Sequence, residues 1–287
     1  MIMKKNIGRA VFVLLLVAAF LQSCRCSHPR VGEADTIVVD TIMVTPSPES
    51  IWRNNVSAIG YPTIPDSVPS QLIERICYSM SYNAETRQPN WVMWQLDGEH
   101  VMKRKKNVWH EYRADESLPD SIRATLEDYA GSGYDRGHMC PGGDCNWTDE
   151  GRNETFVLSN MCPQNPNLNR GDWKEIENAC RRWAQKYGRV YVVCGPMFFK
   201  SEQHQRIGPN QIPVPEAFFK VVLCIDDSVP KGIGFICRNT DGNRKKDFYV
   251  NTIRQVERIT GYRFFTNLPD DTRNTVYDMD SIDIWDK

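Results

Sequence analysis

The 287-residue sequence lacks a charge excess of either sign, because 35 basic residues face 36 acidic ones and the formal net charge is -1. A polycation that binds nucleic acid through its total charge is therefore excluded, and any such binding must come from a local basic face. A CxxC pair is also missing, so zinc has little support, and Cys140-x4-Cys145 alone is a weak signal. Internal repeats are absent. The length fits one large domain or two small ones.

Residues 1–24 are predicted to be a targeting segment. Lys4, Lys5 and Arg9 form a positive start, and an apolar run of 12 residues follows from Ala10 to Leu21. This run has the length of a signal-peptide core and is too short to span a bilayer comfortably. Leu21-Gln-Ser-Cys24 resembles the lipobox of bacterial lipoproteins, although Gln22 departs from the usual small residue.

The lipobox resemblance implies that Cys24 carries a lipid, becomes the mature N-terminus and anchors the protein in a membrane. The protein would then face the periplasm or the cell surface. Ordinary cleavage nearby, which releases a secreted protein, is the alternative. Both interpretations predict a location outside the cytoplasm.

Cysteine usage agrees with that compartment, since disulfides persist in oxidising surroundings. Of the ten cysteines, nine remain when Cys24 is set aside, and an odd number leaves at least one unpaired or paired between chains. We expect disulfides together with some buried free thiols. The sequence does not determine which cysteines pair.

Residues 25–70 are predicted to be a flexible tether, because six prolines interrupt a segment rich in Ser, Thr and acidic residues. A folded domain is predicted for residues 71–287. Strands are expected at 78–82, 90–96, 155–158, 189–194, 217–225 and 232–237, and helices at 173–187 and 253–260, the second closed by Gly261. Without a regular βαβ alternation, this order predicts an α+β fold with a mixed, largely antiparallel sheet and flanking helices.

One histidine stands out among the five, because His138 lies in the polar, glycine-bracketed stretch Ser132-Gly-Tyr-Asp-Arg-Gly-His-Met139. A histidine exchanges protons near neutral pH, and arginine such as Arg136 matches phosphate oxygens in bidentate fashion. These are parts that hydrolysis of a phosphodiester requires. A histidine that is only surface-exposed or hydrogen-bonded in the core is the alternative.

Asn169, Trp173, Glu177 and Arg181 recur every four residues. If a helix begins near Asn169, Glu177 and Arg181 lie on one stripe that leads back to an amide at the helix start. Amide and carboxylate oxygens are donors that suit Mg²⁺. The alternative is an N-cap asparagine followed by a surface Glu–Arg pair.

The ordered blocks of the chain resemble a known family. Tyr134-Asp-Arg-Gly-His138 is similar to the DRGH motif of the DNA/RNA non-specific endonucleases, the ββα-metal nucleases that include endonuclease G. Residues 90–96, 128–132, 156–164, 169–177, 214–220 and 257–262 are similar to further blocks of that family. The resemblance spans about residues 70 to 268 and implies a ββα-metal active site.

The resemblance implies a role for each matched residue. His138 would be the general base, Asn169 the direct protein ligand of a hydrated Mg²⁺ (with Mn²⁺ as an alternative ion), and Glu177 the residue that holds the metal's water shell. Asn160 would support the histidine and the metal site. Arg136 and Arg181 would contact phosphate. The family's further upstream arginine is assigned to Arg104, within the basic run 103–106, with Arg113 as the alternative.

The implied function is Mg²⁺-dependent endonucleolytic cleavage of DNA and RNA with little sequence preference, since contacts to the phosphate backbone carry no sequence information. Two alternatives remain: a catalytically inactive nucleic-acid-binding surface lipoprotein, and a structural disulfide-rich lipoprotein. A homodimer is an open alternative to a monomer. Cys140 and Cys162 each follow one half of the expected site, which suggests a disulfide between them.

Overall fold

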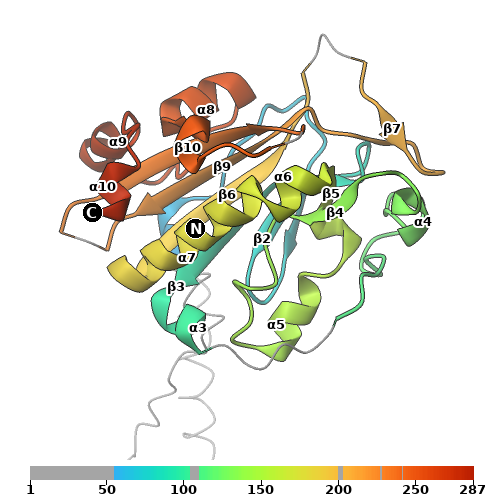
Figure 1. Cartoon of the computed structure of the whole chain (residues 1–287), viewed down its shortest axis with the longest axis horizontal. Coiled ribbons are helices and arrows are strands. Elements are labelled where there is room, and N and C mark those ends of the chain that lie inside the picture. Colours follow the sequence, from blue (N-terminus) through green and yellow to red (C-terminus); the bar gives the residue numbers. More distant parts are fainter. Residues whose placement is uncertain (1–54, 104–109, 200–202, 227, 241) are drawn as a thin grey trace, which may run out of the picture. The chain divides into compact units, whose positions relative to one another are not determined.

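A seven-stranded antiparallel sheet is the centre of the computed structural model, which describes residues 55–103, 110–199, 203–226, 228–240 and 242–287 (Figure 1). Neighbouring strands pair antiparallel throughout this sheet. The predicted α+β fold is confirmed. In spatial order the strands are β1 (Gln71–Glu74), β2 (Ser79–Asn83), β3 (Gln88–Asp97), β6 (Arg189–Met197), β9 (Ala217–Cys224), β10 (Lys231–Arg238) and β11 (Val250–Asn251).

Both faces of this sheet are buried, which explains why its central strands read as nearly continuous apolar runs. Successive side chains of a strand point to opposite faces. Trp94 of β3 therefore joins the core under α7 (Asp172–Tyr187), and Met93 joins the core under α8 (Ile253–Thr260) and α9 (Asp270–Val276). Figure 1 shows α7 crossing one face of the sheet.

Smaller elements beside β2 and β3 carry the sequence motifs. The DRGH residues form β4 (Asp135–His138), which pairs antiparallel with β5 (Met161–Gln164). A third apolar cluster supports this pair. The remaining elements are α3 (Gly98–Met102), α4 (Leu126–Tyr129), α5 (Asp149–Glu154), η1 (Leu158–Asn160), α6 (Pro166–Arg170), β7 (Arg206–Ile207), β8 (Ile212–Pro213), η2 (Lys246–Tyr249) and α10 (Asp283–Asp286).

Most predicted elements are present, and one strand was wrong. The helix Ile253–Thr260 has the predicted bounds, and Gly261 ends it with φ of +75°. No strand covers residues 155–158, where Val157 forms only an isolated bridge with Arg113. This segment, Thr155-Phe-Val-Leu158, instead follows the end of α5 and leads into η1. Its residues have high strand propensity, but tertiary packing overrides a propensity signal of only four residues.

The folded part begins before the predicted boundary at residue 71. Val56 and Ile59 are buried in the core under α8, and Thr63 pairs with Arg263. The predicted signal peptide, Cys24 and the first part of the predicted tether lie outside the described residues. Within the described ranges, none of the helices has the length and apolarity that a membrane crossing requires.

Cysteines in the described part of the chain are buried thiols, and none of the eight forms a disulfide. The predicted Cys140–Cys162 bridge is not formed. The sulfur of Cys140 instead lies 3.7 Å from that of Cys145. Burial raises the pKa of the Cys162 thiol well above its ordinary value, so this thiol is unreactive in the folded protein.

Candidate active site

Strand β4 places Arg136 and His138 on one face, because residues two apart in a strand point the same way. Both contact Tyr112: the Arg136 guanidinium carbon lies 4.4 Å from the ring centroid, and the His138 ring lies 5.6 Å from it. Gly137 between them is required by close packing. A Cβ at this position would lie 2.3 Å from Oε1 of Gln164 on the paired strand.

The His138 imidazole is held among aromatic rings and keeps one nitrogen without a protein partner. Phe156 packs edge-on against it at 5.0 Å, and its Nε2 atom is buried without a hydrogen bond to any described residue. Burial, followed by the charge of Arg152, lowers the pKa of His138 to about 4. The ring is therefore neutral at pH 7 and has a nitrogen lone pair available to accept a proton.

We expect the lowered pKa of His138 to be visible by NMR. The Cε1–H signal that disappears in the His138→Ala variant should titrate with a midpoint near pH 4 and well below the ordinary 6.5, because burial and Arg152 disfavour the charged ring. A midpoint at or above 6.5 would show that the folded protein does not lower the pKa of His138, which would contradict a buried imidazole near Arg152.

Asn160 supports the segment that follows His138. It is fully buried, and its side chain accepts from the Cys140 N–H at 2.9 Å and donates to the carbonyls of Cys140 and Thr155, both at 2.9 Å. Its own carbonyl accepts from the Met139 N–H at 2.9 Å. All of these contacts are with backbone. The Asn160 side chain therefore positions the backbone of Cys140 and Thr155.

Replacing Asn160 with alanine should lower the free energy of unfolding by about 2–4 kcal/mol, because three buried backbone groups lose their partner. Urea denaturation measures this change. The control is Asn274→Ala, at an exposed position of α9, which we expect to stay within about 0.5 kcal/mol of the wild type. Equal effects of the two substitutions would show that the buried amide carries no such role.

Asn169 lies on the short helix α6, so the condition that one helix begins near Asn169 and continues to Arg181 is not met, whereas the helix predicted at 173–187 is present as α7. Gly171, with φ of -107° and ψ of -105°, separates α6 from α7. The Asn169 amide donates from Nδ2 to Oδ2 of Asp135 at 2.9 Å, and Arg170 pairs with the same carboxylate at 2.6 Å. Asp135 thus fixes the orientation of Asn169. This orientation leaves Oδ1 of Asn169 without a hydrogen bond among the described residues.

The residues present fit a hydrated divalent cation. Oδ1 of Asn169 is an oxygen donor whose amide is oriented by Asp135, and Asn169 lines a pocket of about 440 Å³ together with Asp135 and Arg136. No group of three or more His, Cys, Asp or Glu residues in the described ranges forms a metal cage. A cation bound here would therefore have few protein ligands. Mg²⁺ suits such a site because it retains several of its waters.

Glu177 and Arg181 lie together on α7, next to the turn that follows Cys140. Arg181 donates from Nε to Asp144 at 2.6 Å, and its Nη2 lies 3.6 Å from Glu177. Asp144 also accepts from the Trp94 indole at 3.0 Å. Burial raises the pKa of Glu177, while Lys220 and Arg181 oppose that shift. Arg181 is mainly occupied with carboxylates, so its first task in this structure is to position Asp144 and Glu177.

Lys220 is a fully buried ammonium beneath this group. Its Nζ lies 4.2 Å from the centroid of the Trp173 ring and 5.2 Å from that of Trp94, with no hydrogen-bond partner in the described residues. Burial lowers the pKa of Lys220, but the neighbouring Cys194, Glu177, Cys180 and Asp144 raise it by more, so the pKa is raised overall. Lys220 therefore balances the charge of the two buried carboxylates.

The two candidates for the upstream arginine differ in what the structure says of them. Arg104 lies outside the described residues. Arg113 is hydrogen-bonded through its backbone to Phe156 and Leu158, with distances of 3.2 and 2.8 Å, and it directly follows Tyr112. These contacts place the main chain of Arg113 beside the aromatic group around His138.

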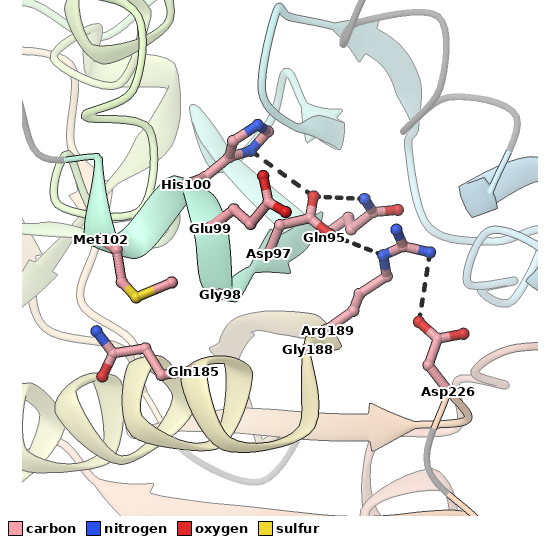
Figure 2. A pocket seen from close by; sticks show the side chains of 10 residues that line it. All are labelled: Gln95, Asp97, Gly98, Glu99, His100, Met102, Gln185, Gly188, Arg189 and Asp226. Carbon is pink, nitrogen blue, oxygen red and sulfur yellow. Dashed lines mark hydrogen bonds and ion pairs between the residues drawn. The ribbon is translucent and has the colours of Figure 1, made fainter.

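Another pocket, of about 510 Å³, lies where β3 meets α3 and shares no residue with the pocket beside Asn169 (Figure 2). Its charges are largely paired, since Arg189 reaches Asp97 at 2.8 Å and Asp226 at 3.3 Å. His100 is stacked on Trp147 at 4.3 Å. The charged and aromatic side chains of this pocket are thus engaged with one another, and we assign no catalytic role to His100.

Comparison with known proteins agrees with this geometry. A family model described as DNA/RNA non-specific endonuclease matches residues 55–271. The chain belongs to this family. The mitochondrial nuclease 1 of Schizosaccharomyces pombe is 35% identical over 243 residues, which is 78% of this chain and 75% of that protein. Human mitochondrial endonuclease G is 36% identical over 162 residues, or 54% of each chain.

A solved structure described as an EndoG/EndoGI complex is also similar, with a TM-score of 0.72 and 28% identity. The match covers 82% of this chain and 99% of that chain. The protein is therefore a non-specific endonuclease of this family, which hydrolyses phosphodiester bonds with the help of a metal ion. The pocket beside Asn169 is the candidate active site of this endonuclease.

Several residues around this site were not predicted from the sequence. Asp144 was given no role, and its partner Arg181 is 37 positions away. Asp135 belongs to the DRGH motif, but nothing in the sequence indicated that it accepts a hydrogen bond from Asn169. Lys220 is buried against two tryptophan rings, and no local sequence pattern indicates this, because the contact depends on the order of the strands in the sheet.

Proposed function

We propose that the protein is a Mg²⁺-dependent endonuclease that cleaves both DNA and RNA with little sequence preference. The observation that carries this proposal is the pairing of a neutral His138, with one unpartnered nitrogen, and an Asn169 oxygen fixed by Asp135. A base and a cation ligand on neighbouring elements are what attack of water on a phosphodiester requires.

The geometry supports the following roles within this proposal. His138 accepts the proton of the attacking water, and Tyr112 and Phe156 keep its ring in place. Arg136, stacked on Tyr112, faces the same side and binds phosphate oxygens. Asn169 would hold the Mg²⁺ (or Mn²⁺) directly and Glu177 its water shell. When bound, this ion neutralises charge that develops on the phosphate and the leaving oxygen.

Two arginine roles belong to the proposal. Arg181 still has Nη hydrogens directed toward Glu177, so a phosphate near the metal's water shell can share them. Arg113 is the better candidate for the upstream phosphate contact, because its backbone is fixed next to Phe156. Arg113→Ala should therefore impair cleavage more than Arg104→Ala. Preference for either DNA or RNA is not expected from contacts to phosphate alone.

Location and assembly remain predictions, because Cys24 lies outside the described residues. We propose an extracytoplasmic protein that a lipid on Cys24 anchors in a membrane. A homodimer remains the alternative to a monomer. Mass spectrometry of the N-terminal peptide tests the lipid, since the lipidated peptide should carry the mass of the attached acyl groups. An unmodified N-terminus generated by ordinary cleavage would overturn it.

Incubation of residues 27–287 with a plasmid and with a structured RNA, in Mg²⁺ or in EDTA, tests the activity. We expect fragmentation of both substrates in Mg²⁺ and of neither in EDTA. Retention of the substrates on a gel without cleavage would support the catalytically inactive binding protein instead. If the substrates are neither cleaved nor retained, the result would support a structural lipoprotein instead.

A further inference from the structure

Arg152 on α5 lies one aromatic ring away from the proposed base. Its guanidinium carbon is 5.8 Å from the centroid of Phe156, and Phe156 contacts His138 edge-on at 5.0 Å. Arg136 stands in the same relation to His138 through Tyr112, and the Tyr112 and Phe156 rings contact each other at 5.3 Å. Two arginines are thus stacked on the two rings that hold the imidazole.

The guanidinium of Arg152 has donors to spare. Its Nη1 donates to Oδ1 of Asn146 at 3.1 Å, and its Nε is buried without a partner in the described residues. A guanidinium has five N–H donors, so at least one face of the fork is not used by the protein. The side chain is half-buried, which leaves part of it in contact with solvent.

Arg152 also lacks a counter-ion. Among the described residues, Arg152 forms no ion pair with a carboxylate, whereas Arg181, Arg170 and Arg189 each have one. The charge of Arg152 instead contributes to the lowered pKa of His138, and burial lowers the pKa of Arg152 itself. A partly buried guanidinium without a carboxylate partner costs free energy, and here it also lowers the pKa of the neighbouring base. An anion that binds the guanidinium during function would offset this cost.

We propose that Arg152 binds a phosphate of the nucleic acid adjacent to the scissile phosphate. This inference rests on the proposed nuclease function and adds a binding position to it. The guanidinium would receive the flanking phosphate through its unused N–H donors, while Phe156 and Asn146 hold its plane. Arg136 and Arg152 would then contact consecutive parts of the backbone on the two sides of the aromatic group.

The decisive experiment compares substrates with and without a flanking phosphate. Arg152→Met removes the charge but retains an apolar stem over Phe156. On an oligonucleotide of about a dozen residues, we expect KM to rise about tenfold with kcat changed less than threefold. On a dinucleoside monophosphate, whose only phosphate is the scissile one, the variant and the wild type should perform alike. Arg152→Lys should recover part of the lost affinity.

Binding measurements provide an arm that does not depend on turnover. In a His138→Ala background, the slope of log K against log[salt] for the same oligonucleotide should fall by about 0.7–0.9 when Arg152 is replaced, which corresponds to one phosphate contact. Arg258→Met is the matched control. Arg258 is exposed on α8, which covers the opposite face of the sheet from α7, so the slope should not change.

Three outcomes would overturn the proposal. These are an unchanged salt slope, an equal loss on the oligonucleotide and on the dinucleoside monophosphate, or a loss that Arg258→Met reproduces. An equal loss on both substrates would show that Arg152 acts only through His138 and Phe156. Absence of cleavage by the wild type would refute the nuclease function itself, and the salt slope would still decide whether Arg152 contacts phosphate.

Discussion

Replacing His138 with alanine should lower kcat by about 10²–10⁴-fold, the usual contribution of a positioned general base. The imidazole is neutral at pH 7, packed between Tyr112 and Phe156, and keeps Nε2 without a partner among the described residues. Its removal leaves the metal and phosphate contacts but no group that accepts the proton of water. Initial rates of plasmid nicking in Mg²⁺ measure this loss.

The matched control is His100→Ala, which removes an imidazole that stacks on Trp147 away from the pocket beside Asn169. We expect this variant to keep its kcat within a factor of about three of the wild type, because no step is assigned to His100. Circular dichroism melts check that both variants fold. A folded His138→Ala enzyme with nearly wild-type kcat would remove the histidine from the mechanism.

Replacing Asn169 with alanine should raise the Mg²⁺ concentration for half-maximal rate, and lower the rate itself, by at least about 10–100-fold. Losses of this size are typical when even an outer-shell partner of a bound metal is removed. The substitution deletes the side-chain oxygen of Asn169, whose amide Asp135 orients and which belongs to a residue that lines the pocket. Mg²⁺ titrations of the cleavage rate measure both effects.

Asn167→Ala is the control on the same short helix, at an exposed position of α6 that does not line the pocket. We expect its Mg²⁺ titration to match that of the wild type. If Asn169→Ala and the wild type have the same half-maximal Mg²⁺ concentration, the ion is bound elsewhere. The half-maximal Mg²⁺ concentration of Asp135→Ala should lie between those of the wild type and Asn169→Ala, because Asn169 then loses its orientation but keeps its oxygen.

The central strands and the site motif could be predicted because their signals are local. The apolar runs at β3, β6, β9 and β10 correspond to strands buried on both faces, and Gly261 supplied the αL residue that ends α8. The family resemblance was equally readable, since its blocks occur in order, and the family match is confirmed.

Features that depend on distant partners were out of reach. The separate short helix α6 was not predicted, because the four-residue spacing from Asn169 to Arg181 is also compatible with one continuous helix, while the backbone at Gly171 has φ and ψ of -107° and -105°. The Thr155–Leu158 segment has a strand-like composition, yet it forms no strand and only Val157 makes an isolated bridge, with Arg113. Residues 56–63 pack on a core formed mainly by later parts of the chain.

Charge pairing was the least predictable part of the site. Asp135 and Asp144 each hold a residue of the site, and each is more than 30 positions from its partner. The cysteines illustrate the same limit: proximity in sequence to both halves of the site suggested Cys140–Cys162, whereas Cys162 lies opposite Gly137 in the β4–β5 pair and the Cys140 sulfur lies 3.7 Å from that of Cys145.

A crystal structure of the His138→Ala enzyme with Mg²⁺ and a short uncleaved DNA duplex examines the central claim directly. We predict one ion bound to Oδ1 of Asn169 and to a non-bridging oxygen of a single phosphate, with a water poised for attack where the imidazole stood. An ion bound away from Asn169, or a phosphate out of reach of the vacated histidine position, would contradict the account.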